Sequence, residues 1–110
     1  MLKLMNSAMM PQPGLYRVQK ISPEQAREIL KKHNNTFESY IGYEDTARFM
    51  SQILGVDVPV NRAETVLADE DEILVCKLKY RVAKPSDKGK FTPSDEDYEW
   101  FWVKYLKLNS

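Results

Sequence analysis

The stretch SYIGYEDTARFMSQILGVDVPVNR, residues 39–62, contains the change from strand to helix that decides the fold class of this chain. Residues 37–41 can form a short strand, and Gly42 breaks it. Tyr43 then lies at the hinge before a helix, where the first backbone N–H groups have no partner within the helix. A large phenol at such a hinge raises the question of what it contacts.

Two helices are predicted, and the signals at their ends are local. EDTARFMSQIL, directly after Tyr43, has helical periodicity, with Gly55 placed for a left-handed C-cap. SPEQAREILKKHNN, residues 22–35, begins with Ser22 as N-cap, and Gln25 can complete a capping box. The apolar faces of the two helices are formed by Ala26, Ile29, Leu30, Ala47, Met50, Ile53 and Leu54.

The remaining segments predict strands joined by turns and one long loop, residues 83–97. A turn is expected at residues 11–14, PQPG. The expected strands are a short one around Leu2 and Leu4, LYRVQKI (15–21), TVL (65–67), EILVCKLKYRV (72–82) and YEWFWVKYLKL (98–108). The fold class is therefore α/β, a mixed sheet of about five strands with flanking helices.

The last predicted strand has aromatic side chains on both faces. Alternation places Phe101, Val103 and Tyr105 on one face and Trp100, Trp102 and Lys104 on the other. Either both faces are covered within the chain or one belongs to a partner, and we expect a homodimer if the face with the two tryptophans is uncovered.

Length and charge restrict the classes of function. A chain of 110 residues that is 43% hydrophobic fits one domain, residues 1–110. Sixteen basic and sixteen acidic residues give no net charge, which argues against duplex DNA as a partner. No apolar run approaches the ~20 residues of a membrane span, and the N-terminal residues make a poor signal peptide, so a cytoplasmic location without membrane contact is expected.

Groups with catalytic or metal-binding chemistry are few. His33, the single histidine, is interpreted as a solvated residue that complements a helix dipole. Cys76, the single cysteine, is interpreted as a small buried residue. The acidic residues 69–72, DEDE, are expected to form a polar turn before a strand, because metal sites need converging ligands. No metal and no cofactor are expected.

Several motifs together resemble one small protein family. They are LMNSAM near the N-terminus, S-x-IG-x-x-x-TA followed by a helix ending in LG, then V-x-V-x-V-NR, and an apolar strand closing on Tyr80 and Arg81. In order and spacing this pattern resembles the viral ring nucleases, the type III anti-CRISPR proteins. The resemblance covers nearly the whole chain and is weakest after Arg81.

The resemblance implies a dimer that binds cyclic tetra-adenylate in a pocket across its two-fold axis and cleaves it without metal, with a ribose 2′-hydroxyl as nucleophile. The family's catalytic histidine follows the Ile-Gly pair, a position held here by Tyr43. Tyrosine has a reference pKa of ~10 and is a weaker acid than imidazolium. Tyr43 can still donate a hydrogen bond to a nucleotide or stack on adenine, and the plain alternative is that it packs over the helix.

Other site residues follow from the same resemblance. Arg81 matches the arginine implied to stabilise the cleaved phosphate, and its alternative is a structural salt bridge. The family's following glutamate has no clear counterpart, because the nearby residue is Lys84, which suits phosphate binding. The expected ligand-binding residues are Asn6, Ser7, Ala8, Gly42, Tyr43, Arg81 and Lys84. Asn61 and Arg62 match the NR pair and are expected to brace the fold more than to touch ligand.

Three functions remain open at this point. One is a viral or mobile-element antagonist of host defence that sequesters a cyclic oligoadenylate or related messenger. The second is an active ring nuclease that uses Tyr43 and Arg81, and the third is a structural interaction protein. The absence of both the histidine and the glutamate favours sequestration over cleavage.

Overall fold

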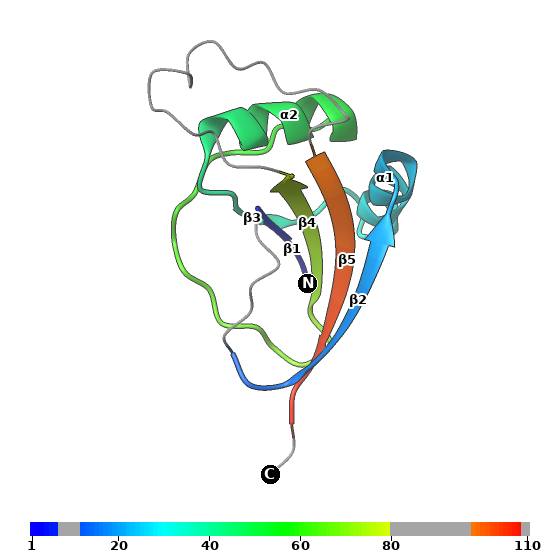
Figure 1. The fold of residues 1–110 in the computed structure, drawn as a ribbon, viewed down its shortest axis with the longest axis vertical. Helices are drawn as coiled ribbons and strands as arrows, with labels where there is room; N and C mark the ends of the chain where they lie inside the picture. Colours follow the sequence, from blue (N-terminus) through cyan, green and yellow to red (C-terminus); the bar gives the residue numbers. More distant parts are fainter. Residues whose placement is uncertain (7–11, 80–97, 109–110) are drawn as a thin grey trace.

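A mixed five-stranded sheet and two helices form the part of the chain that the computed structural model describes, residues 1–6, 12–79 and 98–108 (Figure 1). The predicted α/β fold is confirmed. The strands are β1 (Leu2–Met5), β2 (Leu15–Ile21), β3 (Glu38–Tyr40), β4 (Glu72–Leu78) and β5 (Tyr98–Leu106), and the helices are α1 (Pro23–Lys32) and α2 (Glu44–Leu54).

The sheet has the strand order β2-β5-β4-β1-β3. β1 pairs in parallel with β3 on one side and with β4 on the other, whereas β5 is antiparallel to both β4 and β2. The parallel half therefore has its carboxyl ends at one edge, directly after Met5 and Tyr40. That edge is where a ligand site is expected in sheets with parallel strands.

α2 has the bounds that its capping signals predict, whereas α1 begins at its predicted N-cap but ends at Lys32, before the end of the predicted stretch 22–35. The backbone N–H of Gln25 donates to Ser22 Oγ at 3.2 Å, and the N–H of Ser22 donates to Gln25 Oε1 at 2.9 Å, which completes the capping box of α1. α2 ends at Gly55, whose φ of 72° is left-handed. Tyr43 is the N-cap residue of α2 and makes no side-chain capping bond.

One face of the sheet is covered by both helices and holds the larger core. Leu2, Leu4, Leu74 and Cys76 from the sheet pack there with Ala26, Leu30, Ala47, Phe49, Met50 and Leu54 from the helices. Trp100 is 2% exposed and lies 6.3 Å from Phe49 between ring centroids. Trp100 therefore belongs to the chain's own core, and of the two alternatives left open by the sequence, its face of β5 is covered within the chain.

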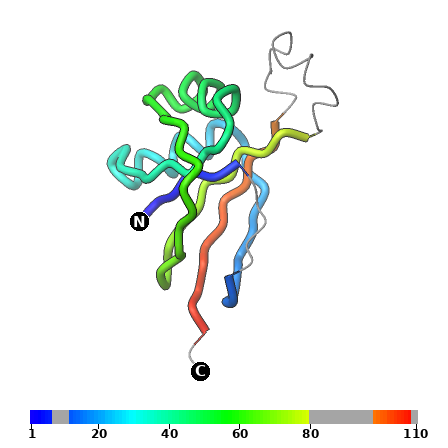
Figure 2. The backbone as a smooth tube through the Cα atoms, turned by 90° about the vertical axis from the view of Figure 1, so that its left-hand side faces the viewer, coloured from blue at the N-terminus to red at the C-terminus, as the bar shows by residue number. Residues whose placement is uncertain are grey.

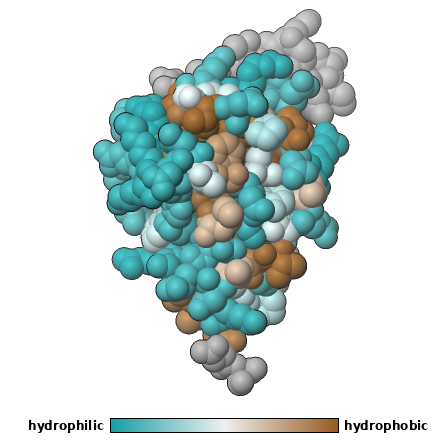
Figure 3. Space-filling model, turned by 180° about the vertical axis from the view of Figure 1, so that it is seen from behind, coloured by the Kyte–Doolittle hydropathy of each residue, from teal (hydrophilic) through white to brown (hydrophobic). Residues whose placement is uncertain are grey.

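The opposite face carries a smaller cluster, on which the described residues place no helix. Leu67, Ile73, Val75, Val103 and Tyr105 are buried in it, and Met5, Tyr16 and Phe101 are half-buried beside them. The other side of the molecule, where the helices lie, has a mainly hydrophilic surface with some hydrophobic side chains exposed near its centre (Figure 3). The predicted alternation of β5 is confirmed, but the less covered face is the one with Phe101.

Residues 62–67 form an extended segment, which we call the strap, that runs beside the sheet after α2 (Figure 2). The strand predicted at residues 65–67 is wrong. Both backbone groups of Leu67 bond to the side chain of Gln12, and the carbonyl of Val66 accepts a bond from Lys3. The side chains of Gln12 and Lys3 thus bond to backbone groups that a neighbouring strand would otherwise pair with.

The last two strands are shorter than the sequence predicts. β4 ends at Leu78 and Lys79 lies in a bend, while β5 ends at Leu106. The rest of the predicted strand 72–82, together with the predicted loop 83–97, lies outside the described residues. Neither α1 nor α2 is long and apolar enough to span a membrane.

Candidate functional site

An open pocket of about 340 Å³ lies beyond the carboxyl ends of β1 and β3. Its position follows from the parallel pairing of these strands, which brings the residues after Met5 and Tyr40 to the same edge. The lining residues are Asn6, Tyr40, Gly42, Tyr43, Arg62 and Ala63. Three of them, Asn6, Gly42 and Tyr43, are predicted ligand-binding residues, and the structure brings them together.

Gly42 is held by two other pocket residues. Its backbone N–H donates to Asn6 Oδ1 at 3.1 Å, and its carbonyl accepts from Arg62 Nε at 2.9 Å. A Cβ added to Gly42 would lie 3.6 Å from Arg62 Cγ and 3.9 Å from Asn6 Oδ1, which are ordinary contact distances. Three chain segments therefore meet at one residue of the pocket lining.

Residues 59–61, directly before the strap, are hydrogen-bonded to β3 and to Ile41, which directly follows β3. Asn61 donates from its backbone to the carbonyl of Ile41 at 2.8 Å and from its side chain to the carbonyl of Ser39 at 3.0 Å. Ser39 Oγ donates in turn to the carbonyl of Pro59 at 2.6 Å. Asn61 braces the fold, as expected.

Arg62 both braces the fold and lines the pocket. Its Nε is used in the bond to Gly42, and among the described residues its guanidinium forms no ion pair. The two terminal nitrogens are therefore available to a ligand. A guanidinium in this state suits the bidentate recognition of phosphate oxygens. The expectation that Arg62 mainly braces the fold is thus too narrow.

Tyr43 presents its phenol to solvent at the pocket. The side chain is 55% exposed, although a tyrosine packed over the helix would be mostly covered. Tyr40 supplies a second phenol to the same pocket from the end of β3. Two aromatic rings and a cation give the pocket hydrogen-bond donors, ring faces and a positive charge.

The polar groups of the described lining are an amide, a guanidinium and two phenols. None of the six lining residues is a histidine, cysteine, aspartate or glutamate. Within the described ranges, no group of three or more such residues could hold a metal ion. The described lining therefore offers no imidazole or carboxylate for general acid or base catalysis.

The remaining predicted site residues lie outside the described part of the chain. They are Ser7, Ala8, Arg81 and Lys84. Two lining residues, Tyr40 and Ala63, escaped the sequence analysis. The position of Tyr40, three residues before Tyr43 on the other side of Gly42, was a usable signal, because both flank the break after a strand.

His33 lies away from the pocket and is not simply solvated. Its Nε2 is 2.9 Å from Glu72 Oε2, and Glu72 Oε1 accepts from Trp102 Nε1 at 2.8 Å. The histidine is only 22% exposed, so its interpretation as a solvated end of α1 is wrong. His33 instead joins the C-terminus of α1 to the first residue of β4.

The acidic run and the cysteine behave largely as the sequence indicates. Residues 69 and 70 form a turn before β4, but Asp71 is 5% exposed and pairs with Lys3 at 3.2 Å. Cys76 is completely buried, and burial raises the pKa of its thiol. Neither residue contributes to the pocket lining.

The fold and pocket define a small α/β protein with an open site at the ends of two parallel strands. A family model described as STIV B116-like matches residues 2–99, and the chain belongs to that family. It is 36% identical over 86 residues to protein ORF117 of Acidianus two-tailed virus, covering 76% of this chain and 74% of that protein. It is 34% identical over 103 residues to protein 26 of Sulfolobus islandicus filamentous virus, covering 90% and 82%.

The fold is shared with a solved viral protein. B116 of Sulfolobus turreted icosahedral virus superposes with a TM-score of 0.71 at 18% sequence identity, over 93% of this chain and 97% of that one. The family thus includes proteins of several viruses, and this likeness extends over almost the whole chain.

Proposed function

We propose that the pocket binds a cyclic oligoadenylate or a related nucleotide messenger and sequesters it, so that the protein antagonises a nucleotide-signalled host defence. The observation that carries the proposal is the position of Arg62. It is anchored to Gly42 through Nε, beside the phenols of Tyr40 and Tyr43, in a pocket whose lining has no carboxylate. A phosphodiester can bond to the guanidinium while a base stacks on a phenol.

The viral relatives and the sequence motifs support the same reading. Asn6, Gly42 and Tyr43 occupy the positions at which the ring nuclease resemblance implies ligand contacts, and all three line the pocket. Arg81 and Lys84, which lie outside the described residues, complete the proposed phosphate contacts on the strength of the sequence alone. Sequestration is favoured over cleavage because the described lining lacks an imidazole.

The proposal includes a second copy of the chain facing the sheet surface opposite the helices. Val18 is 56% exposed, and Phe101 and Tyr16 are half-buried on the face where the described residues place no helix. A two-fold partner would cover these apolar side chains. The sequence resemblance implies a pocket across the two-fold axis, and such a pocket needs the partner. Sedimentation at high micromolar concentration tests this, and a monomer would rule out a pocket shared across the dimer.

The deciding experiment uses cyclic tetra-adenylate as the probe. The protein is incubated with it, the affinity is measured by calorimetry, and the nucleotide is recovered after denaturation and identified by mass spectrometry. We expect a complex from which the ring is recovered intact. Linear products would establish the active ring nuclease instead, and failure to bind cyclic tetra-adenylate or other cyclic oligoadenylates would leave the proposal without its ligand.

A further inference from the structure

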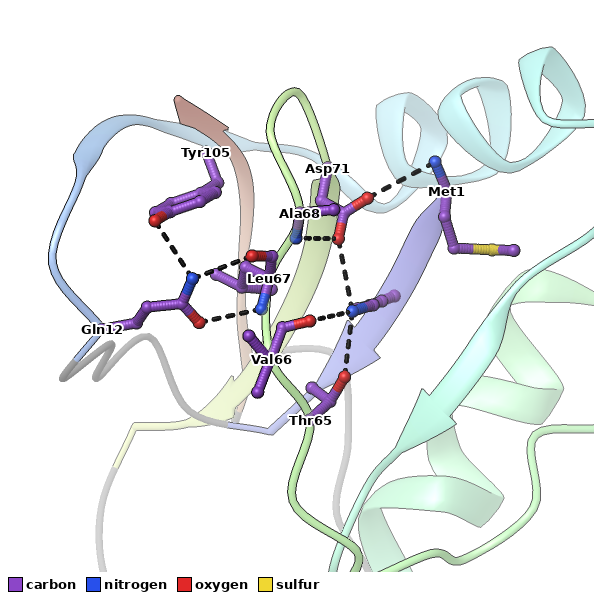
Figure 4. Close-up of polar contacts among 9 residues, drawn as sticks. Met1, Gln12, Thr65, Val66, Leu67, Ala68, Asp71 and Tyr105 are labelled. Carbon is purple, nitrogen blue, oxygen red and sulfur yellow. Dashed lines mark hydrogen bonds and ion pairs between the residues drawn. The ribbon is translucent and has the colours of Figure 1, made fainter. Parts of the chain in front are cut away.

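Lys3 is a buried cation whose ammonium lies under the strap. The residue is 5% exposed, which is unusual for a lysine. Its Nζ donates to Thr65 Oγ1 and to the carbonyl of Val66, both at 2.9 Å, and it pairs with Asp71 Oδ2 at 3.2 Å. Figure 4 shows Thr65, Val66 and Asp71 converging on this one nitrogen. All three N–H groups of the ammonium thus have an acceptor.

Two walls of the pocket are connected to this cation. Arg62 stands three residues before Thr65 on the same strap. On the other side, the ring centroid of Tyr40 lies 5.9 Å from Lys3 Nζ, within the range of a cation–π interaction. Lys3 is therefore in contact both with the segment that carries the pocket's arginine and with one of its two phenols.

The strap depends on such side-chain contacts for its course. It forms no strand ladder with the described strands, and besides the bonds from Lys3 it is held by the two bonds between Gln12 and Leu67 at its far end and by the bond from the N–H of Ala63 to Asn61 Oδ1 near its start. At its near end, the bond from Arg62 Nε to Gly42 holds one atom of the guanidinium. The backbone of the strap must be fixed as well if the two terminal nitrogens of Arg62 are to point in one direction.

We infer that Lys3 is a positioning residue for the pocket: by holding Thr65 and Val66 from below, it fixes the strap so that Arg62 presents its free guanidinium edge to a phosphate. Asp71 holds the buried ammonium in place and is itself held, since its Oδ1 also faces the N-terminal amine and its Oδ2 also accepts from the N–H of Ala68. This inference rests on the proposed function for the role of the pocket, but the orientation of Arg62 can be measured without ligand.

The first measurement follows the Arg62 Nε–Hε signal in ¹H–¹⁵N spectra of the free protein. The variant Lys3→Met/Asp71→Asn removes both buried charges together, so no carboxylate is left unpaired. We expect exchange of the Arg62 Hε proton with solvent to accelerate by about tenfold or more, because losing about 1.4 kcal/mol of hydrogen-bond stability corresponds to tenfold. Leu30→Val is the control, since it perturbs the core under α1, away from the strap, and should leave this signal unchanged.

The second measurement is the affinity for cyclic tetra-adenylate. Thr65→Val removes one acceptor of Lys3, whereas Thr65→Ser keeps the hydroxyl and should restore both the Arg62 signal and the affinity. We expect affinity to fall by about ten- to a hundredfold in the double variant, as for loss of a charged hydrogen bond, and by less in Thr65→Val.

The outcomes separate the two proposals. An Arg62 Hε signal that is unaltered in the folded double variant overturns the role of Lys3. If the double variant does not fold, the two Thr65 variants decide instead. The same Arg62 Hε exchange rate and the same affinity in Thr65→Val and Thr65→Ser would overturn the role of Lys3. A wild-type protein that binds no cyclic oligoadenylate, but whose Arg62 signal responds as expected, supports the role of Lys3 and refutes the proposed function.

Discussion

The carbonyl of Gly42 accepts a hydrogen bond from Arg62 Nε at 2.9 Å, which ties the arginine side chain to the residue directly before the N-cap of α2. The N–H of the same glycine donates to Asn6 Oδ1, so three distant parts of the sequence meet at one residue. Fixing the arginine in the free protein reduces the entropy lost when a ligand binds. Each prediction about binding below depends on this arrangement.

Arg62→Ala should weaken binding of cyclic tetra-adenylate by about 1.5–3 kcal/mol, the range for losing a hydrogen bond to a charged group. Calorimetric titration of the folded variant measures this. The matched control is Arg48→Ala, which removes an equal charge from an exposed position on α2 that pairs with Asp45 and does not line the pocket. Equal effects of the two substitutions would show that only net charge matters.

Tyr43→His should create or greatly increase cleavage of bound cyclic tetra-adenylate. It supplies the imidazole that the sequence resemblance assigns to leaving-group protonation, and general acid catalysis contributes about 10²–10⁴-fold when the geometry is right. The rate should be highest near or below neutral pH, where imidazolium is present. Chromatography of the products over a pH series provides the measurement.

Tyr43→Phe distinguishes the two possible roles of the phenol. If the hydroxyl only bonds to ligand, affinity should fall by about 0.5–1.5 kcal/mol, the net value of one hydrogen bond. If the phenol is a working acid, turnover should disappear while affinity stays nearly constant. Rapid turnover by both the wild type and Tyr43→Phe would contradict the sequestration proposal and the importance of this hinge residue.

Gly14→Ala should destabilise the fold, because the added Cβ would clash with the ring of Tyr105 in β5. A Cβ there would lie 2.2 Å from Cε1 of Tyr105, a ring that is 1% exposed and cannot move freely. Overpacking of this kind costs about 1–3 kcal/mol, to which the positive φ of 156° adds strain. Urea unfolding gives the free energy of unfolding.

Gly55→Ala is the matched comparison for Gly14→Ala. Its φ of 72° is also unfavourable for alanine, but no atom lies within 4 Å of the added Cβ. Its cost should therefore be limited to about 1–2 kcal/mol of left-handed backbone strain. If the two substitutions lowered the free energy of unfolding equally, the ring of Tyr105 would have to move aside at no energetic cost.

The stability of the protein should decrease above pH 9 because of Cys76. Burial raises the pKa of this thiol well above its ordinary value of 9.0, so the unfolded chain loses the proton first. Above that pH the unfolded state binds fewer protons, and the free energy of unfolding falls by about 1.4 kcal/mol per pH unit from this group. Cys76→Ala should lack this contribution, so the difference between the two proteins should shrink from pH 9 upward. A difference that is constant with pH would contradict the burial of the thiol.

The start of α1 and both ends of α2 could be predicted from the sequence because their signals are local, whereas α1 ends at Lys32, before the end of the predicted stretch 22–35. Ser22 and Gln25 cap each other within one turn, and Gly55 follows the last apolar position of α2. The strand order could not be predicted, since it depends on which distant strands pair. The strand at residues 65–67 was predicted wrongly because nothing near it reveals that Gln12 would bond to Leu67.

The candidate site also contains some residues that could be predicted from the sequence and others that could not. Gly42 and Tyr43 could be singled out because strand, glycine and helix follow one another directly. The pocket role of Arg62 depends on a bond to a residue 20 positions earlier, and the contact of His33 with Glu72 spans 39 positions. Pairings over such distances leave no pattern in a single sequence.

The position of β1 has a consequence for how the nascent chain matures during translation. β1 leaves the ribosome first, yet its two neighbours, β3 and β4, are synthesised much later, and β4 is the one that joins it to the antiparallel half. Until residues 72–78 emerge, Leu2 and Leu4 can gain only the short pairing with β3 and whatever cover the helices give. The pairing of β1 with β4, and with it the burial of Lys3 beside Asp71, therefore has to wait until about two-thirds of the chain has been made.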